Sequence, residues 1–133
     1  MNINLDLKKI ALKVATPKQL NGYIGYGHVG AAIQTDAGNV YTGVSIDTAC
    51  SLGFCAEHAA VAEMLKHGEC RVKAFVAVDS QGNALPPCGR CRELISQLNK
   101  HNRNALVEVQ NGVVVSLAQL LPYDWKEHLP NPW

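Results

Sequence analysis

Two short segments of the chain carry side chains that could bind a metal ion and move a proton. One is Cys55-Ala56-Glu57 and the other is Pro87-Cys88-Gly89-Arg90-Cys91. Three cysteine thiolates leave the fourth tetrahedral position of Zn²⁺ open for water, as a catalytic zinc site requires. Zinc lowers the pKa of such a water from about 15.7 toward about 7, and Glu57 follows the first cysteine closely enough to exchange a proton with it. The pattern therefore predicts one catalytic zinc ion on the three cysteines, with Glu57 as the acid–base group.

The same cysteines allow two other interpretations. A fourth thiol or imidazole would close the zinc site and make it structural. The candidates for this fourth ligand are Cys50, His58, His67 and Cys70. Cys88 and Cys91 alone form a Cys-x-x-Cys pair, which is also typical of redox dithiols, although no thioredoxin-like strand precedes it. Both alternatives stay open, but Glu57 favours catalysis because a structural zinc needs no carboxylate.

Length and charge limit the classes of protein to consider. The chain has 133 residues, 47% of them hydrophobic, so we expect one domain over residues 1–133 with a substantial core. A net charge of +1 offers no broad phosphate-binding face, and we expect no nucleic-acid partner. No apolar run is long enough to cross a bilayer, and residues 1–9 lack the apolar centre of a secretory signal.

The cysteine count indicates a reducing compartment. Five cysteines are an odd number, and three of them are assigned to the metal. We expect the other two, Cys50 and Cys70, to be small buried apolar side chains. A cytoplasmic protein without a membrane partner is therefore predicted.

Hydrophobic periodicity predicts a mixed order of helices and strands. The predicted helices cover residues 3–14, 55–67 and 88–100, with a short helical segment at 117–121. The predicted strands cover residues 29–34, 40–46, 72–78, 106–110 and 113–116. Residues 22–30 and 79–87 are expected to be loops, and residues 122–133 an irregular tail. This order is typical of the α/β class, and we expect a three-layer α/β/α sandwich around a mixed five-stranded sheet.

Both cysteine segments fall where a predicted helix begins. The positive end of a helix dipole, with its unpaired N–H groups, stabilises thiolates. Two such helices lying side by side would bring Cys55, Cys88 and Cys91 onto one ion.

These motifs resemble the short, three-cysteine form of the cytidine deaminase family. The similar segments are Val29–Ala32, Thr42–Gly43, Cys55–Glu57, Pro87–Arg92 and Leu120–Pro122, within roughly residues 22–125. The two cysteine segments also match the signature of zinc-dependent base deaminases. The resemblance implies one Zn²⁺ per subunit and a homotetramer with active sites at subunit interfaces.

The resemblance also implies the reaction and its setting. The expected activity is hydrolytic deamination of cytidine or deoxycytidine to uridine or deoxyuridine and ammonia, in pyrimidine salvage. Zinc-activated water would attack C4 of the cytosine ring while Glu57 protonates N3 and then the leaving amine. The backbone near Ala56 and the carbonyl of Pro86 or Pro87 would contact the base. A zinc-binding module without turnover is the competing interpretation.

The part that would bind the sugar departs from the family pattern. Ser45 and Asp47 stand where the family has Asn and Glu. Strand alternation places both on one face, so they could bind sugar hydroxyls, or they could merely cap a strand end. The aromatic residue that the family usually has before Val29 is replaced by Gly27. Tyr26 could supply the ring instead, and His28 could be a polar contact or an ordinary loop histidine.

Two further departures concern charge and the tail. The family often has an arginine after the catalytic glutamate to hydrogen-bond the cysteine sulfurs; here that residue is His58, and Arg90 is predicted to take the role. The Cys88–Arg92 segment is similar to blasticidin S deaminases, which suggests a cytosine nucleoside with a bulky aminoacyl-type substituent as the alternative substrate. In the tail, Tyr123 and Trp125 could close a neighbouring subunit's pocket or anchor the tail to the surface.

Overall fold

The structure is a computed structural model that describes residues 5–130 of the chain. The helices are α1 (Leu5–Val14), α2 (Ala56–Lys66), α3 (Gly89–Leu98) and the 3₁₀ segments η1 (Lys100–Asn104), η2 (Leu117–Leu120) and η3 (Trp125–His128). The strands are β1 (Lys18–Gln19), β2 (Ile24–Thr35), β3 (Val40–Thr48), β4 (Val72–Asp79), β5 (Ala84–Leu85), β6 (Leu106–Gln110) and β7 (Val113–Ser116). The predicted order of elements is confirmed, and the two-residue strands β1 and β5 and the 3₁₀ segments η1 and η3 are additions to it.

The sheet is mixed, as predicted. Its five longer strands lie in the order β3-β2-β4-β6-β7. β2 pairs antiparallel with both β3 and β4, β4 pairs parallel with β6, and β6 pairs antiparallel with β7. The parallel pair is connected through α3, the helix that carries two of the three candidate metal ligands.

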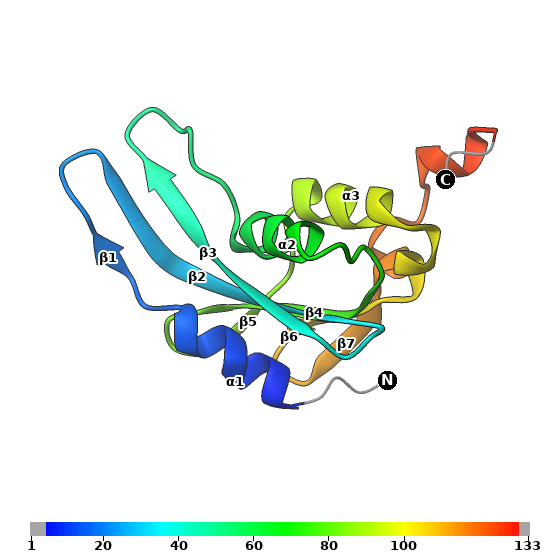
Figure 1. Cartoon of the computed structure of the whole chain (residues 1–133), viewed down its shortest axis with the longest axis horizontal. Helices are drawn as coiled ribbons and strands as arrows, with labels where there is room; N and C mark the ends of the chain where they lie inside the picture. The colour runs from blue at the N-terminus through cyan, green and yellow to red at the C-terminus, as the bar shows by residue number, and fades with distance from the viewer. Residues whose placement is uncertain (1–4, 131–133) are drawn as a thin grey trace.

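Helices cover both faces of the sheet, which gives the expected three layers (Figure 1). On one face α1 packs Leu7 and Ala11 against the β4 side chains Val76 and Val78. On the other face α2 and α3 pack against Phe75 and the rest of a larger core. Because neighbouring residues of a strand point to opposite faces, the continuous apolar run of β4 supplies both layers.

A glycine in β3 allows α2 to lie directly on the sheet. A Cβ atom at Gly43 would come within 2.4 Å of the Ala60 nitrogen and 2.5 Å of the Ala56 oxygen. Gly43 therefore sets the depth at which the first turn of α2 sits, and with it the height of the adjoining Cys55.

The glycine-rich stretch 22–30, predicted as a loop, belongs mostly to β2. The pairing of β2 with β3 shifts register between Tyr26 and Gly30, which marks a β-bulge. Within it Gly27 has a φ of +81°, a value that favours glycine. The prediction failed because bulge glycines and loop glycines look alike in a sequence, whereas the pairing that makes this segment a strand is formed by distant residues.

We expect Gly27→Ala to destabilise the fold more than Gly38→Ala. Both glycines have a positive φ, but a Cβ atom at Gly27 would lie 2.2 Å from the Thr16 carbonyl oxygen, whereas Gly38 has open space. A non-glycine residue at positive φ carries backbone strain of about 1–3 kcal/mol, and both substitutions introduce it. The difference in lost stability between the two variants therefore measures the clash at Gly27. Denaturant unfolding of the two variants measures that difference, and equal losses of stability would contradict the close approach of β2 to Thr16.

The loop after β4 is held by the side chain of Asp79. Its Oδ1 atom accepts hydrogen bonds of 2.9 Å from the backbone N–H groups of Gln81 and Asn83. These bonds, that of Asn83 first, lower the pKa of Asp79 below its ordinary value. The turn leads through β5 into the second cysteine segment, so Asp79 helps to place that segment.

Asp79→Asn is therefore expected to make the free energy of unfolding less dependent on pH in the acid range. A carboxyl group whose pKa is lower in the folded protein stabilises the fold above its unfolded pKa of about 3.9, and this stabilisation is lost as the pH falls through the folded pKa. Urea unfolding at several values between about pH 5 and pH 2 measures the slope of the free energy of unfolding against pH. Asp36→Asn is the control, because the Asp36–Arg71 ion pair is exposed and surface pairs contribute little. An unchanged slope in Asp79→Asn would refute this role.

Some expectations for the remaining segments were wrong. Cys50 is exposed and Cys70 is partly exposed, so neither is a buried apolar side chain. The helix predicted to end at Lys100 ends at Leu98, because Asn99 adopts an extended backbone before η1. Ile3 and residues 131–133 of the predicted tail lie outside the described residues. Within residues 5–130, no helix combines the length and apolarity needed to cross a membrane.

Candidate metal centre and pocket

The candidate metal centre lies where α2 and α3 begin. Cys55 and Cys88 are the residues that precede the first turns of these helices, and both have extended backbones without a side-chain capping bond. Their sulfur atoms therefore sit at the positive ends of the two helix dipoles, which favours the thiolate form. The first turn of α3 contains no acidic residue. At the N-terminus of α3, the groups that can carry a negative charge are therefore Cys88 and Cys91.

The three cysteine sulfurs converge. Sγ of Cys88 lies 3.3 Å from Sγ of Cys55 and 3.3 Å from Sγ of Cys91. Sγ of Cys55 and Sγ of Cys91 lie within 4.8 Å of each other. A tetrahedral site with Zn–S bonds of about 2.3 Å needs sulfurs about 3.8 Å apart. Each of the two pairs that Cys88 makes would open by about 0.5 Å to hold a zinc ion.

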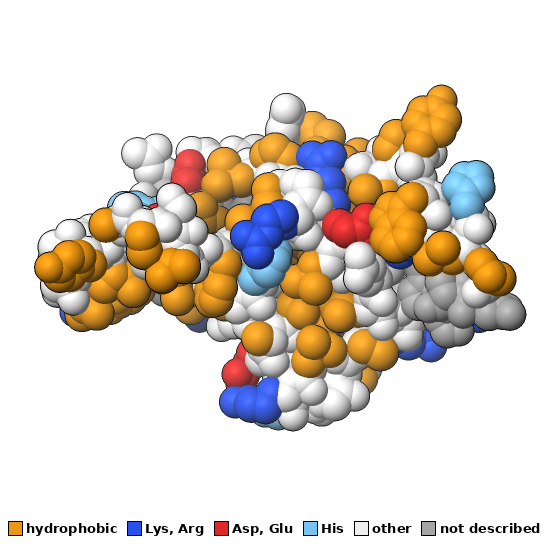
Figure 2. Space-filling model, turned by 90° about the horizontal axis from the view of Figure 1, so that it is seen from above, with side chains coloured by type: hydrophobic (Ala, Val, Ile, Leu, Met, Phe, Trp, Pro, Cys, Tyr) orange, Lys and Arg blue, Asp and Glu red, His pale blue; other side chains and the backbone are white. Residues whose placement is uncertain are grey.

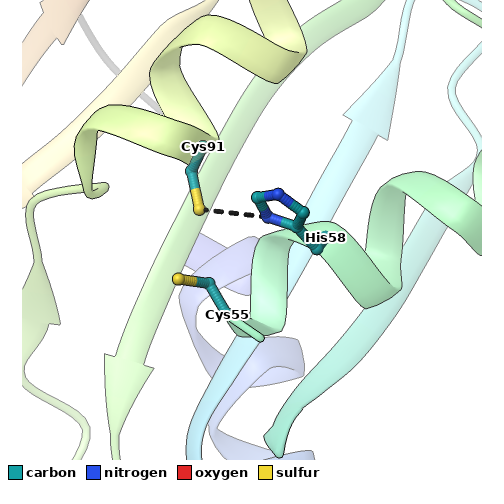
Figure 3. A group of neighbouring side chains, drawn as sticks. All are labelled: Cys55, His58 and Cys91. Carbon is teal, nitrogen blue, oxygen red and sulfur yellow. Dashed lines mark hydrogen bonds between the residues drawn. The ribbon is translucent and has the colours of Figure 1, made fainter. Parts of the chain in front are cut away.

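His58 joins this group from α2 (Figure 3). Its Nδ1 atom lies 3.5 Å from Sγ of Cys91, and Cys55, His58 and Cys91 form a cluster of donors within 4.8 Å of one another. Burial, helped by the positive charge of Arg90, lowers the pKa of His58. A neutral imidazole can either donate to a sulfur or bind a metal. His58 is one of four residues that could supply a fourth ligand, and only the geometry distinguishes it from Cys50, His67 and Cys70.

The spacing of these donors repeats between the two helices. Cys55 and His58 are three residues apart, as are Cys88 and Cys91, so each helix offers a residue before its first turn and a second residue one turn later. His58 lines the groove between α2 and α3, whereas Cys55 and Cys88 line the main pocket. A metal on the three sulfurs would therefore meet the imidazole from the side away from that pocket.

The thiols differ in acidity. Burial, together with the negative charge of Glu57, raises the pKa of Cys91, and burial with the hydrogen bond to Cys88 raises the pKa of Cys55. Although burial opposes it, hydrogen bonds from the backbone of Cys91 and from the Cys55 thiol hold the pKa of Cys88 below its usual value. Cys88 is thus the most acidic of the three thiols, and metal binding to the set would release protons.

Glu57 is buried beside this centre. Only 4% of its surface is exposed, and burial raises the pKa of its carboxyl group. A carboxyl group with a raised pKa can hold and release a proton closer to neutral pH, which suits a general acid–base group. Glu57 lines the same pocket as Cys55 and Cys88.

The pocket has a volume of about 510 Å³, within the usual range for a small-molecule site. It brings together many of the residues singled out in the sequence. Those that line it are Ser45, Asp47, Cys55, Ala56, Glu57, Pro86, Cys88 and Arg90. His28 also lines it and lies with Nε2 4.0 Å from Oδ2 of Asp47.

The described part of the single chain does not contain the contacts expected of Tyr26, Arg90 and Trp125, and that of Trp125 is expected with a neighbouring subunit. Neither Tyr26 nor Trp125 lines the pocket, and the wall beyond the bulge at Gly27 is formed by His28. Trp125 donates its Nε1–H to Oε1 of Glu93 on α3, at 2.8 Å, which is a contact of the kind expected if the tail is anchored to the surface of its own chain. Among residues 5–130, the side chain of Arg90 makes no hydrogen bond to a cysteine sulfur; its backbone contributes to the hydrogen bonding of Cys88.

Comparisons with known proteins agree with this centre. The family model for the cytidine and deoxycytidylate deaminase zinc-binding region matches residues 1–106. The chain therefore belongs to this family of zinc-dependent deaminases, as the resemblance predicted. Zinc is its metal, and a donor set of thiols and an imidazole is the kind that zinc prefers.

Individual relatives are similar over most of the chain. A cytidine deaminase of Mycobacterium tuberculosis is 38% identical over 84 residues, which are 61% of this chain and 63% of the relative, so the match spans less than two thirds of its length. A blasticidin-S deaminase of Bacillus cereus is 36% identical over 105 residues, 71% of this chain and 74% of the relative. The crystal structure of cytidine deaminase from Mycobacterium leprae superposes with a TM-score of 0.75 at 30% identity, covering 91% of this chain and 99% of that chain. The predicted fold class is confirmed.

Proposed function

We propose that this chain is a zinc-dependent aminohydrolase that converts cytidine or deoxycytidine and water to uridine or deoxyuridine and ammonia. One observation carries the proposal: the buried carboxyl group of Glu57 lines the same pocket as Cys55 and Cys88. A proton-transfer group and metal-binding sulfurs on one small-molecule pocket are what hydrolysis of a ring amine requires. The similarity of the chain to cytidine deaminases supports the same reaction.

The proposed ligands are Cys55, Cys88 and Cys91. Zinc bound by them supplies Lewis-acid activation of the attacking water. Glu57 takes a proton from that water, passes it to N3 of the ring, and transfers the second proton to the amine that leaves as ammonia. Its burial keeps bulk water away from the carboxyl group, so the proton stays on the path between water and base.

Ser45 and Asp47 are proposed to bind the sugar. The Ser45 hydroxyl accepts a hydrogen bond of 3.0 Å from the Val29 N–H, which leaves its own proton free for a ligand. Asp47 lies on the same face of β3 and can accept from a sugar hydroxyl. The backbone at Ala56 is proposed to contact the base, and Arg90 to compensate the charge of the thiolates.

We also infer a homotetramer in which Tyr123 or Trp125 closes a neighbouring subunit's pocket, while Tyr26 supplies a ring near the nucleoside. Exposed hydrophobic side chains support this assembly; they include Leu20, Tyr23, Leu52, Tyr123 and Trp125. Hydrophobic side chains lie toward both ends of the face that α2 and α3 cover (Figure 2). Five unpaired cysteines support a reducing compartment, and hence the cytoplasm. The proposed substrates, cytidine and deoxycytidine, would place the enzyme in pyrimidine salvage. The whole chain, 1–133, is taken as one deaminase domain with a nucleoside partner and no nucleic-acid or membrane partner.

The test is ammonia release by the zinc-loaded protein with cytidine, deoxycytidine, free cytosine and blasticidin S. We expect turnover of cytidine or deoxycytidine and much weaker turnover of cytosine, because cytosine lacks the hydroxyls that Ser45 and Asp47 would bind. Asp47→Asn should raise KM for the nucleoside and leave KM for cytosine unchanged. Turnover of blasticidin S alone, or of none of the four, would refute the proposed substrate.

A further inference from the structure

The side chain of Arg92 connects the second cysteine segment to a distant part of the chain. Its Nε–H donates to the carbonyl oxygen of Pro87 at 2.8 Å, and its Nη1–H donates to the carbonyl oxygen of Leu120 at 3.4 Å. Its backbone N–H donates to the carbonyl oxygen of Cys88 at 3.1 Å. One half-buried arginine thus bridges the segment before α3 and the end of η2.

The segment that Arg92 holds can donate few backbone hydrogen bonds of its own. Pairing between β4 and β5 ends at Leu85, and the next two residues, Pro86 and Pro87, have no backbone N–H to donate. A proline can be held through its carbonyl oxygen, and that of Pro87 is occupied by Arg92. Pro86 lines the pocket on one side of this bond, and Cys88 stands on the other.

The far end of the bridge is well anchored. η2 begins at Leu117, which is fully buried in the larger core and whose N–H donates to the carbonyl oxygen of Ala105 at 2.9 Å. The next residue of α3, Glu93, independently binds the tail through Trp125 and the buried Lys126. The bond from Arg92 to Leu120 therefore ties the cysteine segment to a rigid part of the fold.

The position of Arg92 is unusual for a positive charge. It lies near the N-terminus of α3, where the helix dipole disfavours cations. Two carbonyl oxygens offset this cost, and they are reached by different nitrogens of one planar guanidinium, which carries several N–H groups. A lysine ammonium would keep the positive charge but lacks the planar set of N–H groups that reaches both carbonyl oxygens.

We propose that Arg92 is a positioning residue that fixes both the Pro86 wall of the pocket and the metal ligand Cys88. This proposal rests on the proposed function in taking Cys88 as a zinc ligand. Arg92 touches neither the substrate pocket nor a cysteine sulfur. It acts through Pro87, the residue between the two groups that it positions.

The first test is Arg92→Lys in the full-length, zinc-loaded protein. We expect zinc transfer to a chromogenic chelator to become about tenfold faster, the low end for loss of an outer-shell partner, and KM for cytidine to rise more than kcat falls. Arg71→Lys is the matched control, because Arg71 makes a single exposed ion pair with Asp36. Zinc transfer and KM in Arg92→Lys that equal those of Arg71→Lys would overturn the proposal.

Chemical rescue separates positioning from a general loss of structure. In Arg92→Ala, added methylguanidinium should restore slow zinc transfer at concentrations that leave the melting temperature of Arg71→Ala unchanged, whereas methylammonium should not. Fast transfer that methylguanidinium does not slow would overturn the proposal. Zinc transfer needs no turnover, so if the wild type holds zinc but deaminates nothing, the proposed function fails while these measurements still decide the role of Arg92.

Discussion

Replacing Glu57 with glutamine is expected to reduce ammonia release from cytidine by at least about 100-fold, while one zinc ion per chain stays bound. A positioned acid–base group is typically worth about 10²–10⁴-fold in rate. Glutamine has nearly the same shape as glutamate but cannot take up the proton of the attacking water. The side chain is buried and is not one of the proposed ligands, so the metal content should not change.

Glu63→Gln is the matched control on the same helix. Glu63 is partly exposed and pairs with Lys66 and His67, away from the pocket. We expect it to keep wild-type activity and zinc content. Activity in Glu57→Gln within a few-fold of that in Glu63→Gln would mean that another group moves the proton.

The second large effect concerns which side chains hold the zinc. We expect Cys88→Ser, which removes a ligand, to weaken zinc binding by more than about 100-fold. We expect His58→Gln to weaken it by no more than about 100-fold, the upper end for loss of a residue that contacts a ligand but not the metal. The reason is geometric: Sγ of Cys88 lies 3.3 Å from both other sulfurs, whereas His58 approaches Cys91 from the groove away from the pocket. Competition with a chelator measures both affinities.

Cobalt substitution provides a second readout for the same pair of variants. Co²⁺ in the wild type and in His58→Gln should show the same tetrahedral spectrum with three thiolate ligands, and Cys88→Ser, which keeps Cys55 and Cys91, should show weaker thiolate-to-metal absorption per bound ion. Loss of the metal in His58→Gln with retention in Cys88→Ser would instead establish a Cys55–His58–Cys91 site. In that case Cys88 would not be a metal ligand, and the coordination position left for water would differ from the one proposed.

The core of the candidate site could be predicted because its signal is local. Cys55, Glu57, Cys88 and Cys91 lie within one turn of two helix starts, and helical periodicity alone brings each pair to the same end of its helix. The fold class followed from the order of elements in the same way. The spacing of Cys55 and His58, equal to that of Cys88 and Cys91, could also have singled out His58, but one histidine among five carries little weight without geometry.

What could not be predicted depends on distant pairing. β2 extends through a glycine-rich stretch because Gly25 and Tyr26 pair with Asp47 and Ile46 of β3, and the bulge at Gly27 is shaped by the Thr16 carbonyl. This bulge is also why His28, rather than Tyr26, lines the pocket. The bridge made by Arg92 joins residues far apart in the chain and leaves no periodic signal.

Ammonia release from cytidine, measured as metal-free protein is titrated with zinc, tests most directly whether this chain is a zinc-dependent deaminase. We expect the rate to rise in proportion to added zinc and to stop rising at one equivalent per chain, with uridine as the only other product. If the protein binds one equivalent of zinc without releasing ammonia, or releases ammonia equally well without zinc, it is not such an enzyme.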